Sequence, residues 1–338
     1  MSFRSSSSSA NLRRPSSAIK YSCALLCALS AACSSSSDPA TGASLAGASS
    51  GGAESSTAGN SAAGAGAPPA GSAGSPAGSA GAATGGTGNS AAGAAAQSNG
   101  GFTLLYRDDF ERFDSARWQV MTHSWDTNLA IFSQESVSVR DGHLELALLP
   151  APAGTVDPEG AAKSFFGAEV RSVDTIAYGR VRARVKFASG SAVVSSLVTI
   201  YTPWPADNWN ELDIEHLGAQ PTANQFNTMV YTGAPVTLPA TKSVSPTQEP
   251  YAHHPDYAVS DDFHVYAIEW TPASAKFYVD DALVYTWTKH IALMTLPQNV
   301  LLTIWASSSV AWAGAVKEET GKAVASYDWI ELYKYSAP

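Results

Sequence analysis

Alternation of apolar and polar residues is the main pattern in the second half of this chain. Residues 179–187 read "GRVRARVKF", where Val181, Ala183, Val185 and Phe187 alternate with basic residues. A period of two predicts a β-strand that turns its apolar side chains to a core and its charges to solvent. Further runs of this kind are "HLELALL", "FHVYAIEWT", "AKFYVDDALVYTWT", "VLLTIWAS" and "SYDWIELYKY".

The residues that separate these runs are typical of an all-β fold. Asp280 and Asp281 interrupt two β-rich runs, which predicts a hairpin. No segment of a dozen residues shows helical periodicity. Short strands between clusters of Gly, Pro, Asn and Asp predict an antiparallel sandwich or barrel. We expect Trp270, Trp287 and Trp329, which lie within the predicted strands, to pack in the core.

The first 33 residues resemble an export signal. Basic residues between Arg4 and Lys20 precede the apolar run "CALLCALSAAC", which is too short to span a bilayer. Its end, "LSAAC", resembles a bacterial lipoprotein cleavage box, although Ser30 stands where such boxes usually have Leu. The resemblance implies lipidation of Cys33 and a cell-envelope protein that meets the membrane only through this anchor. Ordinary secretion is the alternative. All three cysteines lie in this segment, so we expect no disulfide in the mature domain.

Residues 34–101 differ in composition from everything that follows. They are mostly Ala, Gly, Ser and Thr, contain no aromatic residue, and predict a disordered spacer. All nine tryptophans lie after Phe102, so we assign residues 102–336 to one folded domain. The net charge is −9 with 20 Lys and Arg, and the domain has no basic cluster, which argues against nucleic acid as a partner.

The segment "NWNELDIEHLG" places three acids at every second position. On a strand, Glu211, Asp213 and Glu215 would share one face, opposite Leu212 and Ile214. The outer two Cα atoms would be about 13 Å apart, and side chains leaning together would reach the carboxyl separation of about 5–5.5 Å of a retaining glycosidase. Asp213 between them can hydrogen-bond the nucleophile and separate the pKa values of the two glutamates.

Two other interpretations fit the three acids taken alone. Acids are stable on the solvated outer face of an edge strand, and alternating carboxylates also suit calcium. Neither interpretation accounts for the many tryptophans and tyrosines spread through the rest of the domain.

At these residues the chain resembles glycoside hydrolase family 16, and within it the lichenase-like β-glucanases. "ELDIE" matches the signature Glu-x-Asp-x-Glu and lacks the extra residue of the laminarinase branch. Further matches follow in family order through the domain, among them "DDFERFDSARW", "FGAEVRS", "YGRVRARVKF", "QFNTMVYTG" and "YDWIELY". The resemblance implies a β-jelly-roll sandwich of the concanavalin A-like type, with a concave sugar-binding cleft.

The resemblance also implies an activity. Glu211 would be the nucleophile, Asp213 its hydrogen-bonding helper and Glu215 the acid/base of a retaining endo-β-glucanase that cleaves mixed-linkage β-1,3-1,4-glucan. Catalysis would require no cofactor, and we expect a monomer. The positions that match sugar-contacting residues are Asn128, Glu169, Arg171, Tyr201, Trp209, Asn227, Trp305 and Trp312. Asp328 matches the side-chain ligand of a structural calcium ion.

Departures from the family pattern concern the substrate more than the chemistry. Lichenases usually have an aromatic residue at His216, a tyrosine at Met229, and an Asn-x-Trp-Asn stretch where this chain has "TIWA" from Thr303. We expect His216 to be structural. The alternatives are a transglycosylase or hydrolase acting on xyloglucan or another β-glucan, and a non-catalytic surface lectin.

Overall fold

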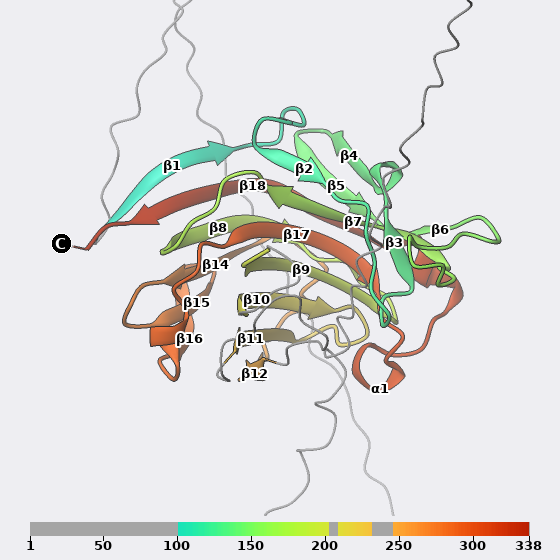
Figure 1. The fold of residues 1–338 in the computed structure, drawn as a ribbon. Helices are drawn as coiled ribbons and strands as arrows, with labels where there is room; N and C mark the ends of the chain where they lie inside the picture. Colours follow the sequence, from blue (N-terminus) through green and yellow to red (C-terminus); the bar gives the residue numbers. More distant parts are fainter. Residues whose placement is uncertain (1–100, 203–208, 232–245, 338) are drawn as a thin grey trace, which may run out of the picture. The chain divides into compact units, whose positions relative to one another are not determined.

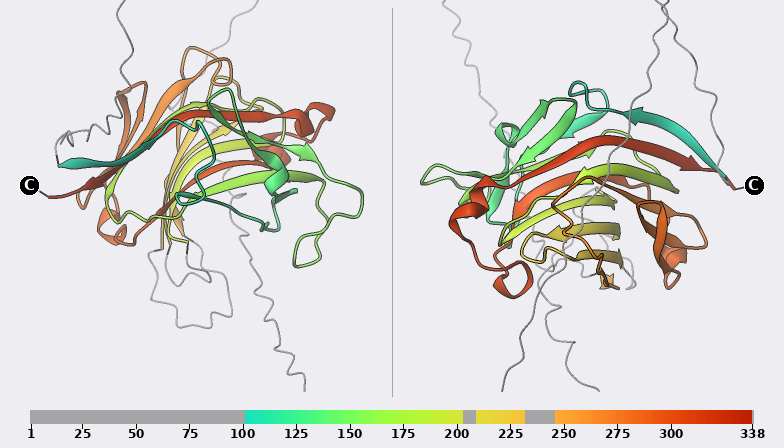
Figure 2. Two further views of the ribbon diagram at one scale, coloured as in Figure 1. Left: turned by 90° about the horizontal axis from the view of Figure 1, so that it is seen from above. Right: turned by 180° about the vertical axis from the view of Figure 1, so that it is seen from behind.

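The computed structural model describes residues 101–202, 209–231 and 246–337. The predicted signal and lipidation site, and the spacer up to residue 100, lie outside the described residues. The described part folds into two β-sheets that pack face to face, as the predicted sandwich requires (Figures 1 and 2). Within this part, no helix is long and apolar enough to cross a membrane.

One sheet has eight described strands in the order β16-β15-β14-β8-β18-β5-β4, with β1 paired to β18. Phe102 at the start of β1 pairs with Tyr335 at the end of β18, so the first and last strands of the domain are neighbours (Figure 1). The strands are β1 (Phe102–Asp108), β4 (Val137–Arg140), β5 (His143–Ala147), β8 (Gly179–Lys186), β14 (His264–Trp270), β15 (Ala275–Val279), β16 (Ala282–Trp287) and β18 (Val324–Tyr335).

The other sheet has ten described strands, with the main order β12-β11-β10-β9-β17-β7-β2. Of its three further strands, β13 pairs with β11, while β3 and β6 pair with β7; the β3–β7 pair is parallel. The strands are β2 (Trp118–Val120), β3 (Ala130–Phe132), β6 (Leu149–Pro150), β7 (Phe165–Ser172), β9 (Val193–Ile200), β10 (Asn210–Leu217), β11 (Asn224–Val230), β12 (Thr247–Gln248), β13 (Tyr251–His253) and β17 (Asn299–Ala306).

Helical structure is confined to short segments in the described residues, as the lack of helical periodicity predicted. They are η1 (Gln134–Ser136), η2 (Ile291–Leu293), α1 (Val310–Ala313) and η3 (Glu318–Lys322). The predicted hairpin is also confirmed: Asp280 and Asp281 join β15 to β16 with φ of 48° and 63°. Aspartate tolerates this left-handed region better than most residues, because its short polar side chain bonds locally.

The core lies between the sheets and follows the predicted alternation. Val181, Ala183 and Val185 of β8 are fully buried, and the basic residues between them lie on the outer face. Trp270 and Trp287 are buried as expected. The strands at the middle of the second sheet are different, because every residue of β9 and of β17 is buried, so that both faces of these strands are covered.

Trp329 corrects one prediction. It is only half-buried and lies on the outer face, with the guanidinium of Arg107 4.4 Å from its ring centre. The pairing of β18 with β8 shifts register between Tyr327 and Trp329, so Asp328 and Trp329 both face outward. An extra residue in one strand reverses the alternation that a strict period of two assumes.

Candidate active site

The three acids lie on β10, an interior strand between β9 and β11. Leu212 and Ile214 belong to the core between the sheets, so Glu211, Asp213 and Glu215 point to the opposite face. Asp213 and Glu215 are 1% and 4% exposed, and Glu211 is partly exposed. The solvated edge-strand interpretation is therefore wrong, since the strand is internal and two of the three acids are buried.

Strand register places other polar groups in line with these acids. Glu215 is paired with Ser196 on β9, Ser196 with Thr303 on β17, and Thr303 with Glu169 on β7. Residues directly opposite each other share one face of a sheet. The hydroxyl groups of Ser196 and Thr303 confirm this, because their oxygens are 2.5 Å apart. One polar row thus crosses four strands.

A second row lies one step along the strands. Asp213 is opposite Asn227 of β11 on one side and Val198 of β9 on the other, and this line continues to Arg171 of β7. Val198, Ile200 and Leu301 form a small apolar cluster separate from the core between the sheets. The acids are therefore set beside apolar side chains, which strengthens electrostatic effects among them.

Hydrogen bonding distinguishes the two glutamates. The indole Nε1 of Trp209 donates to Oε2 of Glu211 over 2.6 Å. Among the described residues, neither oxygen of Asp213 nor Oε2 of Glu215 has a partner of good geometry, and no Lys, Arg or His forms an ion pair with the three acids. The negative charge is therefore best supported on Glu211.

Burial raises the pKa values of all three carboxyl groups. For Glu211 the pKa rises to about 7, with the Trp209 hydrogen bond opposing the rise. For Glu215, burial and the nearby Glu211 raise the pKa to about 8. For Asp213, burial and its two acidic neighbours hold the pKa well above its usual range. Near neutral pH, a carboxylate on Glu211 can thus coexist with protonated Glu215, the division that acid–base chemistry needs.

Glu169 and Arg171, both predicted to contact sugar, form an ion pair. Nε and a terminal guanidinium nitrogen of Arg171 lie 2.9 and 2.5 Å from Oε1 of Glu169. Nε2 of His123 is 3.5 Å from the other Glu169 oxygen, and burial lowers the pKa of this histidine. The negative charge of Glu169 raises the pKa of Glu211. Sequence reasoning missed His123, which matches no family position in the predicted set.

An aromatic cluster adjoins the polar row. Trp305 on β17 packs with Phe132, Val194 and Leu217, and its ring centre is 5.0 Å from that of Trp125. Trp312 of α1 is 5.8 Å from Trp305, and its indole N–H donates to Oε1 of Gln225, the residue opposite Glu215 on β11. Trp305 and Trp312 are thus brought together beside the acids. Trp125 was missed, since it stands alone in a loop.

Three further predicted residues are Asn128, Asn227 and Tyr201. Asn128 is buried and bridges to Ser307, with its Oδ1 accepting the N–H of Ala130. Nδ2 of Asn128 and Oδ1 of Asn227 are both buried without a partner among the described residues. Tyr201 is half-buried just after β9, with its backbone N–H bonded to Asn210.

Asp328 and His216 lie away from the acids. Asp328 lies on β18, in the sheet that does not carry the acids, and its carboxylate is 2.5 Å from the guanidinium of Arg184 on the adjacent strand β8. No group of three or more metal-binding side chains occurs among the described residues. His216 is buried, its Nδ1 2.9 Å from the carbonyl oxygen of Ala223, as a structural role requires.

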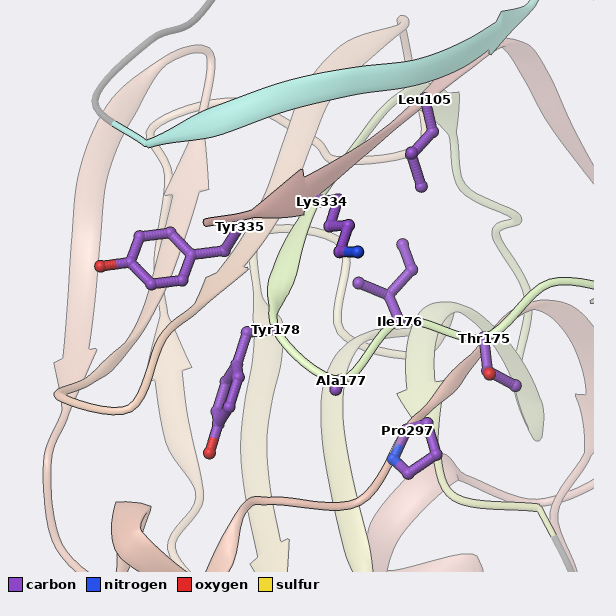
Figure 3. A pocket seen from close by; sticks show the side chains of 8 residues that line it. All are labelled: Leu105, Thr175, Ile176, Ala177, Tyr178, Pro297, Lys334 and Tyr335. Atoms are coloured by element: carbon purple, nitrogen blue, oxygen red, sulfur yellow. The ribbon is translucent and has the colours of Figure 1, made fainter. Parts of the chain in front are cut away.

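A separate hollow of about 410 Å³ lies where β18 meets the loop before β8 (Figure 3). Its lining carries one charged group, the ammonium of Lys334, and no carboxylate. The residues that line it are Leu105, Thr175, Ile176, Ala177, Tyr178, Pro297, Lys334 and Tyr335. It contains none of the predicted site residues, so the candidate active site remains the face of β10.

Comparison with known proteins agrees with this fold. The model of glycosyl hydrolases family 16 matches residues 125–331, and the chain belongs to this family. It is 30% identical over 244 residues to a β-glucanase of Bacillus subtilis, covering 71% of this chain and 89% of that protein. It is 29% identical over 235 residues to a β-glucanase of Acetivibrio thermocellus, covering 68% of this chain but only 62% of that relative.

A solved structure is similar over nearly all of its own length. A β-1,3-1,4-glucanase (lichenase) derived from a mouse hindgut metagenome has 28% identity and a TM-score of 0.57, covering 68% of this chain and 99% of that one. Its match supports the jelly-roll sandwich that the sequence resemblance implied.

Proposed function

We propose that this protein is a retaining endo-β-glucanase that hydrolyses mixed-linkage β-1,3-1,4-glucan. The observation that carries the proposal is the row of three acids on one face of β10, two of them buried. Glu211 has a hydrogen-bond donor, whereas Oε2 of Glu215 has none of good geometry among the described residues. The β-glucanases of Bacillus subtilis and Acetivibrio thermocellus, and the lichenase structure, support a β-glucan as substrate.

In the first step, a carboxylate oxygen of Glu211 attacks the anomeric carbon and forms a glycosyl–enzyme bond. Glu215 donates its proton to the glycosidic oxygen, which leaves with the electrons of the broken C–O bond. Burial and two acidic neighbours hold the pKa of Asp213 well above its usual range, and Asp213 lies next to Glu211 on the same face. Protonated Asp213 would hydrogen-bond the carboxylate of Glu211 and orient it for attack.

In the second step, the Glu215 carboxylate takes a proton from water as the water oxygen bonds to the anomeric carbon. The bond to Glu211 breaks, and Glu211 recovers its carboxylate while Glu215 is protonated again. Two inversions give net retention. No cofactor takes part in either step.

The surroundings of the acids suit a sugar chain. Aromatic rings such as Trp305 and Trp312 bind the apolar faces of pyranose rings, and polar groups bind hydroxyls. The amide nitrogen of Asn128 and the amide oxygen of Asn227, which have no partner in the described part of the chain, suit such hydrogen bonds. We also assign Glu169, Arg171, Trp209 and Tyr201 to the substrate site.

Export of the protein, a lipid on Cys33 and a monomeric state belong to the proposal. They rest on the sequence alone, since residues 1–33 lie outside the described residues. The spacer of residues 34–101 would give a tethered domain reach to a bulky polymer. A structural calcium ion at Asp328 stays a prediction.

A substrate panel tests the proposal directly. The full chain is incubated with lichenan, barley β-glucan, laminarin and xyloglucan, and release of reducing ends is measured. Cleavage of the two mixed-linkage glucans in preference to the others is expected. No reducing ends from any of the four would defeat the proposal, and products lengthened by a labelled oligosaccharide acceptor would reassign the protein as a transglycosylase. Binding of a glucan without cleavage would identify a lectin.

A further inference from the structure

A fully bonded ammonium group lies beneath the loop that carries Trp125 and Asn128. Lys163 precedes β7, and its side chain is 2% exposed. Its Nζ donates to the carbonyl oxygens of Trp125 and Asn128 over 2.9 and 2.8 Å, and lies 3.1 Å from Oδ2 of Asp157. Three oxygen partners match the three N–H donors of an ammonium group, so the charge is bonded on all sides.

The segment that presents Lys163 is itself well fixed. Oδ1 of Asp157 accepts the backbone N–H groups of Glu159 and Ala161 over 3.1 and 2.8 Å. The backbone N–H of Lys163 donates to the carbonyl of Thr155. Residues 155–163 therefore form a closed hairpin loop, which we call the lysine loop, and the ammonium is held at its base.

The ammonium joins this lysine loop to the turn of residues 125–128. Backbone bonds from Ser164 and Phe165 to the carbonyl of Leu129 already hold the chain where β3 begins. Lys163 adds hydrogen bonds to the two residues at the ends of the turn, Trp125 and Asn128. These hydrogen bonds join residues 38 and 35 positions apart in the sequence.

Both ends of this turn carry groups suited to the substrate. The ring of Trp125 packs on Trp305, and Nδ2 of Asn128 is buried without a partner among the described residues. An amide donor left unbonded is costly unless a ligand or water completes it. We propose that Lys163 is a positioning residue for glucan binding, whose ammonium holds Trp125 and Asn128 in place. This inference rests on the proposed function.

Stability alone is a poor explanation of this arrangement. A buried ion pair often contributes little net stability, because removing both charges from water cancels much of their attraction. The two carbonyl contacts, by contrast, fix where the turn stands relative to the polar row. A role in positioning and a role in stability therefore predict different behaviour once the charges are removed together.

The test compares Lys163→Met with the double variant Lys163→Met/Asp157→Asn. The single variant leaves a buried carboxylate without its cation and is expected to lower Tm. The double variant removes both charges but keeps Oδ1 as the acceptor that closes the lysine loop, so Tm is expected to recover in part. We expect KM for the cleaved glucan to rise on the order of tenfold in both variants, with kcat within about twofold of wild type.

Lys322→Met is the matched control. Lys322 is an exposed lysine paired with Glu318, and its loss is expected to change neither KM nor Tm measurably. A double variant whose KM returns to the wild-type value as Tm recovers would show that Lys163 is only structural. A fall in kcat with KM unchanged would equally overturn the inference.

A binding measurement separates this inference from the proposed activity. In the Glu211→Gln background, titration with a mixed-linkage glucan oligosaccharide is followed by tryptophan fluorescence. Adding the double substitution is expected to raise Kd on the order of tenfold. An unchanged Kd would overturn the positioning role. A wild-type protein that binds the oligosaccharide without cleaving it would defeat the hydrolase proposal while leaving this comparison of Kd values intact.

Discussion

Strands β8 and β10 both alternate charged residues with core residues, but they differ in whether the charged side chains form ion pairs. On β8, three arginines alternate with core residues on the outer face, and each has an acidic partner. The pairs are Arg180 with Glu269, Arg182 with Glu331 and Arg184 with Asp328. On β10, three acids alternate in the same way, yet no described cation forms an ion pair with them.

The difference shows where this fold leaves charge uncompensated. Acids are available to pair with every arginine of β8, so the chain can neutralise a row of like charges. On β10, burial instead raises the pKa of Glu211 to about 7, and burial with the nearby Glu211 raises the pKa of Glu215 to about 8. Unpaired buried charge costs stability, and such costs concentrate at sites of chemistry.

The largest expected effect comes from replacing Glu211, the proposed nucleophile. Glu211→Gln keeps the size of the side chain but cannot form the glycosyl–enzyme bond, so kcat should fall at least about a thousandfold. Reducing-end release from the glucan that the wild-type protein cleaves measures this. Unchanged turnover would rule out Glu211 as nucleophile and with it the functional meaning of the unpaired row.

Glu215→Gln should stabilise the fold at alkaline pH. The folded-state pKa of about 8 lies above the ordinary value of 4.5, so the folded protein must ionise a buried group as pH rises through this window. The gain in unfolding free energy from Gln should be absent near pH 4. Above pH 8 it should reach on the order of a few kcal/mol, as the difference between the folded and unfolded pKa values requires. Urea unfolding of both proteins at pH 4 and pH 9 measures it. An equal difference at the two pH values would contradict the assignment.

Trp209→Phe should sharpen the distinction between the two glutamates. Loss of the indole donor removes a bond that favours the Glu211 anion, so the pKa of Glu211 should rise further. The acid limb of the kcat/KM profile should move up by about one pH unit, while the alkaline limb, set mainly by Glu215, stays in place. A shift of both limbs together would mean that Trp209 acts through packing alone.

The smallest effect is expected on the compensated strand. Arg182→Met removes one cation from β8, but Glu331 keeps its contact with Arg107 over 2.8 Å. Unfolding free energy should fall by at most about 1 kcal/mol, with kcat and KM unchanged. Thermal unfolding and the glucan assay measure the two quantities. A clear loss of activity would show that the outer face of β8 is not merely structural.

Local pattern predicted the strands and the position of the acids. The alternation of β8 and the Asp280-Asp281 turn could both be predicted, because each depends on residues next to each other in the chain. The same rule put Glu211, Asp213 and Glu215 on one face. The prediction that Trp329 lies in the core was wrong, because nothing in "YDWIELY" indicates the extra residue that reverses the alternation.

The contributions of the loops could not be predicted in this way. Lys163 reaches Trp125 and Asn128 across 38 and 35 residues, and nothing in the spacing relates them. His123 and Trp125 likewise gain their significance from neighbours on β7 and β17. Such contacts depend on how loops cross the sheet, which the sequence pattern does not encode.

The pairing of β1 with β18 also has a practical consequence for engineering. Phe102 and Tyr335 are register partners in the first and last strands, so the two ends of the folded domain are adjacent in space. A few residues would suffice to join them, which makes the domain suited to circular permutation or to insertion as a cassette into a surface loop of another protein.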